Sequence, residues 1–260
     1  VVDSVIASCH AEGSSALGGG LQLRLRAHII GSTITDCVAA AGGGTSSVVK
    51  GGGIYASSSS VMLVRSTIAR CKITTVVHTE ATLARGGGLG LSTATATITD
   101  SLLHDCVAEN GDGPAYGGAM HLEFESTATL VGTVIRRCAA RGKGAKGGGL
   151  HLDKQSSLLL TGSLVRECTA HSSSELHDAL GGAVSGTAST VRVHETAIRS
   201  CSVRVDSASA SQALPASQPA PPAVAGGGAV AIVSLSALAL DASTVDACSA
   251  HNLLAQERAQ

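Results

Sequence analysis

Aromatic residues are almost absent from this sequence, which holds Tyr55, Tyr116 and Phe124 but no tryptophan. Globular cores normally use aromatic side chains for bulk, so an interior of Val, Ile, Leu and Ala indicates thin, uniform layers. Stacking on nucleic-acid bases also needs aromatic side chains, and the formal net charge of -1 offers no basic excess. We therefore expect no nucleic-acid partner.

Long apolar runs and closely spaced cysteine pairs are missing as well. The most apolar stretch, residues 230–240, is interrupted by Ser234 and Ser236, so we expect no membrane span. No CxxC motif occurs, and 28 to 47 residues separate successive cysteines, which excludes zinc-finger spacing. We expect neither a resident metal nor a cofactor.

The chain does not open with methionine, and Val1 falls in the second half of a repeat. We interpret residues 1–260 as one domain cut from a longer parent chain, whose targeting signals would lie outside it. Cut ends would leave coils unpaired, so we expect the isolated segment to associate end to end or to fray.

What the sequence does contain is a repeat, best seen in Gly147–Ala170 (GGGLHLDKQSSLLLTGSLVRECTA). Counting back from each cysteine, an aliphatic residue stands at −3, a hydroxyl at −5 and another aliphatic at −8; a small or aliphatic residue follows at +2. The cysteines are Cys9, Cys37, Cys71, Cys106, Cys138, Cys168, Cys201 and Cys248. Agreement at all these positions in eight units predicts one repetitive body.

Each complete unit begins with a glycine pair followed by alternating apolar residues, the pattern of a half-buried strand. The distance from the first aliphatic to the cysteine is nearly constant, whereas the segment from the cysteine to the next glycines varies. This predicts an all-β, single-domain parallel β-helix solenoid of about seven to eight coils, with three short strands per coil. The Ala/Ser/Pro-rich stretch at 206–225 is interpreted as a loop insertion.

The Gly-Gly-(Ala/Gly)-aliphatic start and the later aliphatic-x-x-polar-x-Ala motif resemble the repeats of bacterial polymorphic outer-membrane proteins and related surface β-helices. In that family the later motif is usually Phe-x-x-Asn. Here it is aliphatic-x-x-Cys, as in Ile34–Cys37 and Ile198–Cys201. The resemblance implies a right-handed β-helix of the pectin-lyase-like type and a surface, adhesive or passenger role. It implies no catalytic residues.

The cysteine column has two interpretations. Equivalent positions on adjacent coils lie within the Cα separation that a disulfide needs, so up to four bridges could form. Alternatively, the eight residues are buried free thiols that stack as small hydrophobes.

Two further sets of residues are candidates for chemistry. Residues after the first aliphatic of each unit should point outward, which would place His121 and Glu123 beside His151 and Asp153 on an exposed strand face. Two imidazoles and two carboxylates could hold a divalent cation or do acid–base work. A second set is the arginine column at position −2, formed by Arg136, Arg166 and Arg199, which could bind an acidic polysaccharide. The alternative for both sets, and the more common role of such residues, is solvated polar surface.

The function we expect is a structural or adhesive β-helix segment, extracellular or on the cell surface, that presents a rigid face to glycans or surface proteins. The alternative is a carbohydrate-active enzyme, a lyase or hydrolase, with His121, Glu123, His151 and Asp153 as its groove. Because the longest loop is rich in Pro, Ala and Ser and follows the cysteine strand, the non-enzymatic interpretation is preferred.

Overall fold

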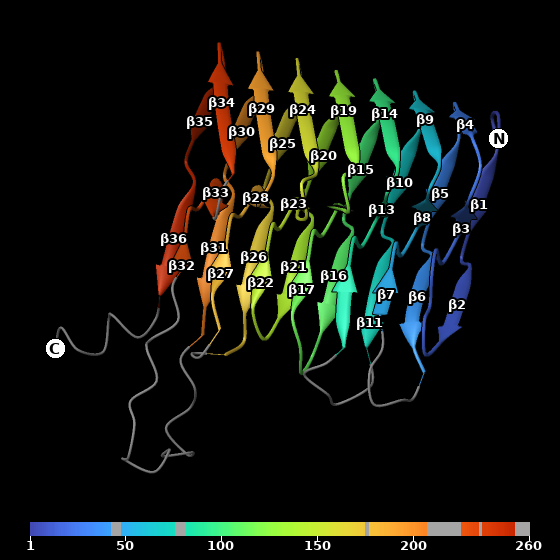
Figure 1. Cartoon of the computed structure of the whole chain (residues 1–260), viewed down its shortest axis with the longest axis horizontal. Helices are drawn as coiled ribbons and strands as arrows, with labels where there is room; N and C mark the ends of the chain where they lie inside the picture. Colours follow the sequence, from blue (N-terminus) through green and yellow to red (C-terminus); the bar gives the residue numbers. More distant parts are fainter. Residues whose placement is uncertain (43–47, 76–81, 175–176, 207–224, 234–235, 253–260) are drawn as a thin grey trace, which may run out of the picture.

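The computed structural model is an all-β parallel solenoid, and it describes residues 1–42, 48–75, 82–174, 177–206, 225–233 and 236–252. Strands of successive coils stack in chain order along the long axis of the body (Figure 1). The predicted fold class is therefore confirmed. The prediction of three strands per coil is wrong, because five parallel sheets run through the described residues.

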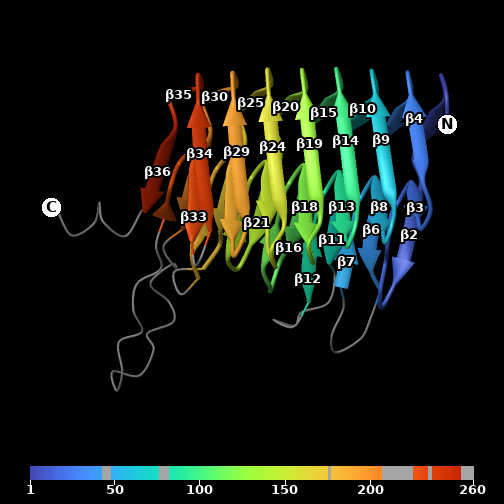
Figure 2. The ribbon, with the colours of Figure 1, turned by 45° about the horizontal axis from the view of Figure 1, so that its top comes forward.

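We number the sheets in the order in which a coil visits them after its glycines. Sheet 1 consists of β3 (Leu21–Leu23), β8 (Ile54–Ser57), β13 (Leu89–Ser92), β18 (Met120–Glu123), β23 (Leu150–Leu152), β28 (Val184–Thr187) and β33 (Val230–Val233). Sheet 2, which comes forward in Figure 2, consists of β4 (Ala27–Ile30), β9 (Ser60–Val64), β14 (Thr95–Thr99), β19 (Thr127–Val131), β24 (Ser157–Thr161), β29 (Thr190–His194) and β34 (Ala237–Asp241).

The next two sheets flank the cysteines. Sheet 3 consists of β1 (Val5–Ala7), β5 (Thr33–Thr35), β10 (Thr67–Ala69), β15 (Leu102–His104), β20 (Val134–Arg136), β25 (Leu164–Arg166), β30 (Ala197–Arg199) and β35 (Thr244–Asp246). Sheet 4 consists of β2 (His10–Gly13), β6 (Val38–Ala41), β11 (Lys72–Thr75), β16 (Val107–Asn110), β21 (Ala139–Gly142), β26 (Thr169–Ser172), β31 (Ser202–Val205) and β36 (Ser249–Asn252).

Sheet 5 lies in the segment whose length varies between units. It consists of β7 (Val48–Lys50), β12 (Leu83–Arg85), β17 (Ala115–Tyr116), β22 (Ala145–Lys146), β27 (Ala179–Leu180) and β32 (Ala225–Gly226). Of the predicted insertion at 206–225, residues 207–224 lie outside the described part of the chain.

Two apolar interiors run along the solenoid. The larger one is enclosed by sheets 1, 2 and 3 and contains the −8 and −3 aliphatics together with the cysteines. The smaller one lies between sheets 4 and 5 and is built largely from alanines such as Ala108, Ala115 and Ala140. The small residue at +2 thus allows sheets 4 and 5 to pack closely against each other.

Left-handed backbone conformations at the corners explain much of the repeat. One such residue precedes each cysteine, for example Arg137 with φ 51° before Cys138. The first glycine of each triplet is another, such as Gly147 with φ 65°. The second glycine has a different role: a Cβ on Gly148 would lie 2.4 Å from the carbonyl oxygen of Gly182 in the next coil. The first two glycines are therefore required, one by its backbone torsion and the other by close backbone contact.

The hydroxyl at −5 satisfies backbone groups where the chain turns from sheet 2 to sheet 3. Ser32 Oγ donates to the carbonyl oxygen of Ile30 (2.8 Å) and accepts from the backbone N–H of Ser4 (3.2 Å). The N–H of Ser32 in turn donates to Ser66 Oγ of the next coil (3.2 Å). Serine or threonine recurs here because buried backbone donors must find partners.

Candidate functional site

The predicted His/carboxylate set lies in the angle between sheets 1 and 5. We call this set and its sheet 5 neighbours the polar corner. From sheet 1 and the turn after it come His121, Glu123, His151, Asp153 and Lys154; from sheet 5 come Lys50, Arg85 and Tyr116. Glycine triplets turn the chain from sheet 5 into sheet 1, so residues just before them face residues just after them.

Sequence reasoning placed these residues on an exposed strand face, and that expectation is wrong for three of the four. His121, Glu123 and His151 do face away from the main interior, but their exposures are only 1%, 0% and 3%. Asp153 retains a side-chain exposure of 17%. Sheet 5, which the sequence did not reveal, covers this face of sheet 1.

The imidazoles and the nearby tyrosine form a stack. His121 and His151 are direct register partners on β18 and β23, with ring centroids 5.4 Å apart. The Tyr116 ring lies 5.0 Å from that of His151 and 6.1 Å from that of His121. Asp153 approaches the same stack, since its Oδ2 lies 3.8 Å from His121 Nε2.

Glu123 has different partners within the same corner. Its carboxylate accepts hydrogen bonds from Lys50 and Arg85 of sheet 5, and Lys154 Nζ lies 3.6 Å away. Burial alone would raise the pKa of Glu123, but the nearby His121, Lys50 and Arg85 outweigh it and hold the pKa below its ordinary value. Glu123 is thus an ion-paired carboxylate and not a free base.

Burial has the opposite consequence for the histidines. It lowers the pKa of His121, although the neighbouring Asp153 opposes the shift. Burial and then the nearby His121 hold the pKa of His151 well below its ordinary value, with Lys146 and Arg85 adding to the effect. Both imidazoles are therefore neutral at pH 7, and Asp153, whose pKa is lowered, is ionised.

These shifts predict that stability falls as the pH drops below neutrality. Unfolded histidines titrate near pH 6.5, whereas His121 and His151 resist protonation in the folded state, so the unfolded chain binds more protons below that pH. Stability should be full above about pH 7 and fall by up to about 1.4 kcal/mol per pH unit for each histidine. Urea unfolding at pH 7.5, 6.5 and 5.5 measures this.

The matched control is the His121→Gln/His151→Gln double variant, which lacks both titrating groups. Its stability should change less over the same pH range than that of the wild type. A wild-type profile that is flat, or that is parallel to the profile of the double variant, would show that these histidines do not carry the pH dependence.

The arginine column lies in register on the outer face of sheet 3. Arg136 pairs with Arg166, and Arg166 with Arg199, on adjacent strands. The Nε atoms of Arg136 and Arg166 are buried and have no hydrogen-bond partner among the described residues. Two acidic residues lie close to the column in sequence: Glu167 lies 3.5 Å from Arg166, whereas Asp105 is engaged by Arg137 at 2.7 Å.

All eight cysteines are free thiols. Each Sγ lies 3.3–3.5 Å from the carbonyl oxygen two residues earlier, to which it can donate. Burial raises the pKa of Cys138 well above its ordinary value, so that this thiol stays protonated. The structure therefore agrees with the second interpretation of the cysteine column, a stack of free thiols.

Two surface features escaped sequence reasoning. A shallow hollow on sheet 2 is lined by Thr127, Thr129, Ser157, Leu159, Thr190 and Arg192, with two buried residues beneath. It lies on a hydroxyl column in register, formed by Ser60, Thr95, Thr127, Ser157 and Thr190. A hydroxyl eleven residues before each of the five cysteines Cys71 to Cys201 was the available signal.

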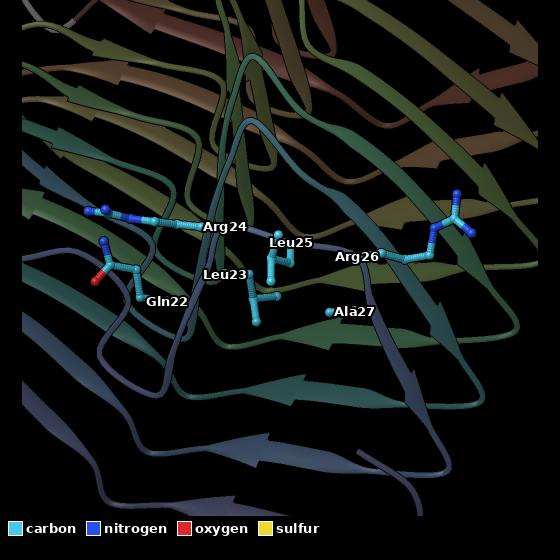
Figure 3. A pocket seen from close by; sticks show the side chains of 6 residues that line it. All are labelled: Gln22, Leu23, Arg24, Leu25, Arg26 and Ala27. Carbon is cyan, nitrogen blue, oxygen red and sulfur yellow. The ribbon is translucent and has the colours of Figure 1, made fainter.

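A second hollow lies where the chain turns from β3 into β4 and is lined by residues 22–27. Figure 3 shows Arg24 and Arg26 extending in opposite directions from this turn, with Leu25 between them. Leu25 is 81% exposed. The lining lacks the paired carboxylates that sugar hydrolysis requires.

Comparison of the chain with protein-family models, with curated proteins and with solved structures finds no match in any of the three. The described residues include no helix able to serve as a membrane span. Interpretation of the function therefore depends on the surfaces described above.

Proposed function

We propose that this chain is a structural or adhesive β-helix segment that presents its arginine column to acidic glycans. The body of the solenoid holds Arg136, Arg166 and Arg199 on neighbouring strands, which are spaced by about 4.8 Å in a β-sheet. A rigid row of guanidinium groups matches a polymer that carries carboxylates or sulfates at regular intervals. This column is the observation that carries the proposal.

The electrostatic balance of the column supports an anionic ligand. Stacked like charges repel one another, and the carboxylates nearby are partly committed elsewhere, since Asp105 is bonded to both Arg137 and His104. Binding of an acidic chain would relieve this repulsion.

The cellular setting belongs to the same proposal. The repeat resembles that of bacterial polymorphic outer-membrane proteins, which supports an extracellular or cell-surface location as part of a longer chain. A surface adhesin of this kind would contact host or matrix polysaccharides through a long face instead of a deep cleft.

The enzymatic alternative required His121, Glu123, His151 and Asp153 to line an open groove. Three of these side chains are buried beneath sheet 5, and Glu123 is held by Lys50 and Arg85. A polysaccharide could reach only the edge of Asp153. This burial favours the non-enzymatic proposal.

The proposal is tested by titrating heparin and polygalacturonate into the folded chain and measuring affinity by calorimetry at two salt concentrations. We expect saturable binding that weakens with salt, and a loss of at least about tenfold in the Arg136→Gln/Arg166→Gln/Arg199→Gln variant.

The control is the Arg24→Gln/Arg26→Gln/Arg65→Gln variant, which removes the same charge from exposed arginines elsewhere. It should bind nearly as the wild type does. Equal losses in the two variants, or no binding by the wild type, would contradict the arginine column as the site. Turnover of either polysaccharide that disappears in His121→Ala would instead support the enzymatic alternative.

A further inference from the structure

The polar corner holds a cluster of three potential metal ligands that the proposed glycan surface does not use. His121 and His151 are adjacent on β18 and β23, and Asp153 directly follows β23. One ligand atom from each of the three lies within 4.8 Å of the other two. We propose that His121, His151 and Asp153 bind a divalent first-row transition metal, with zinc the best match.

Polar atoms without hydrogen-bond partners support the metal site independently of the ligand distances. His121 Nε2, His151 Nδ1 and Asp153 Oδ1 are all buried, and none has a hydrogen-bond partner among the described residues. Buried polar groups in native proteins are nearly always satisfied, so three orphaned atoms in one small volume call for a shared partner. A cation satisfies lone pairs on two imidazoles and a carboxylate at once.

The neighbouring hydroxyl strengthens this pattern. Ser185 is the register partner of His151 on the next coil, and its Oγ is also buried without a partner among the described residues. It lies beside His151 and is a candidate for the fourth position, which a water molecule could equally fill. Structural and catalytic zinc sites use four ligands in most cases.

The protonation states already match those of metal ligands. Burial keeps the pKa of both histidines low, so their imidazoles are neutral, and the lowered pKa of Asp153 keeps its carboxylate ionised. The charges that face the cluster are Arg85, Lys146 and Glu123. Because Glu123 already pairs with Arg85 and Lys50, Asp153 remains the carboxylate available to a metal.

The donor set selects among metals. Two nitrogens and one oxygen suit zinc and other borderline cations, whereas calcium and magnesium prefer all-oxygen sites and copper(I) prefers sulfur. Zinc–nitrogen bonds of about 2.0 Å in a tetrahedron place ligand atoms about 3.3 Å apart, so the side chains must close by up to about 1.5 Å. Asp153 lies outside the strands, directly before the turn that contains Lys154 and Gln155, so its backbone is not fixed by strand pairing.

The experiment is a calorimetric titration of ZnCl₂ into the reduced, folded chain, with CoCl₂ absorption as the spectroscopic probe. We expect one equivalent of zinc and a cobalt spectrum without a near-ultraviolet thiolate band, which separates this site from the eight cysteines. His121→Gln, His151→Gln and Asp153→Asn should each weaken binding by at least about tenfold. Circular dichroism verifies that each variant is folded.

The matched control is His171→Gln, which removes the histidine of an imidazole–carboxylate pair on sheet 4, where His171 Nε2 lies 2.7 Å from Asp206. It should retain full zinc binding. The proposal is overturned if the folded wild type shows no saturable binding, if the control loses as much affinity as His121→Gln, or if bound cobalt shows a thiolate band. Asp153→Asn, which lies in a turn, keeps the test valid should a histidine variant fail to fold.

Discussion

Replacing Gly148 with alanine should lower the free energy of unfolding by about 3 kcal/mol or more. This is the upper end of the range that is typical of substitutions that overpack a protein interior. A Cβ on Gly148 would lie 2.3 Å from the carbonyl carbon of Thr169 and 2.4 Å from the oxygen of Gly182. Both are backbone atoms of paired strands or of the adjacent triplet, so neither can yield by a side-chain rotation. The free energy of unfolding in urea measures the effect.

Gly111→Ala is the matched control. A Cβ added to Gly111 would have no heavy atom of the described residues within 4 Å, and the φ of Gly111 is not in the left-handed region. Its substitution should alter stability by no more than about 0.5 kcal/mol. Similar effects of the two substitutions would contradict the assignment of the second glycine to close coil contact.

Replacing Glu123 with glutamine should cost about 3–5 kcal/mol, because it leaves buried cations without a counter-charge. The Glu123 side chain is fully buried, and those of Lys50 and Arg85 are only 14% and 12% exposed. Glutamine keeps the shape of glutamate, so the loss reports charge and not a cavity. Urea unfolding near pH 7.5 measures it.

Arg70→Gln provides the comparison for an ion pair in solvent. Arg70 binds Asp36 through Nε at 2.7 Å and Nη2 at 2.8 Å, with both side chains largely exposed. Such pairs contribute at most about 1 kcal/mol. A loss in Glu123→Gln as small as that in Arg70→Gln would mean that the polar corner is open to water.

The columns of the main interior were predictable from sequence because each position repeats at a fixed distance from cysteine. Ile34 pairs with Ile68, and Ile68 with Leu103, as a stack of identical positions requires. The hydroxyl at −5 was visible as a column too, although its hydrogen bonds to the preceding coil were not.

Sheet 5 could not be predicted in the same way. Its strands are as short as two residues, such as Ala115–Tyr116, and follow loops of different lengths, so they have no fixed distance from a cysteine. Because sheet 5 was not predicted, His121 and His151 were wrongly expected to be exposed. The available signal was the residue before each glycine triplet, where Lys50, Arg85 and Tyr116 stand.

The composition of the polar corner and that of the arginine column were both visible in the sequence, but the two sets have different surroundings. Burial under sheet 5 separates the corner from large ligands, whereas Arg199 on sheet 3 is exposed. Non-local packing decides this difference, which the local pattern of polar residues does not reveal.

Arginine footprinting tests the central claim most directly. The folded chain is treated with phenylglyoxal with and without heparin, and modification of each arginine is measured by mass spectrometry. We predict that heparin protects Arg136, Arg166 and Arg199, while Arg24 and Arg26 react at unchanged rates. Uniform protection of all arginines, or protection confined to Arg24 and Arg26, would contradict the assignment of the arginine column as the binding surface.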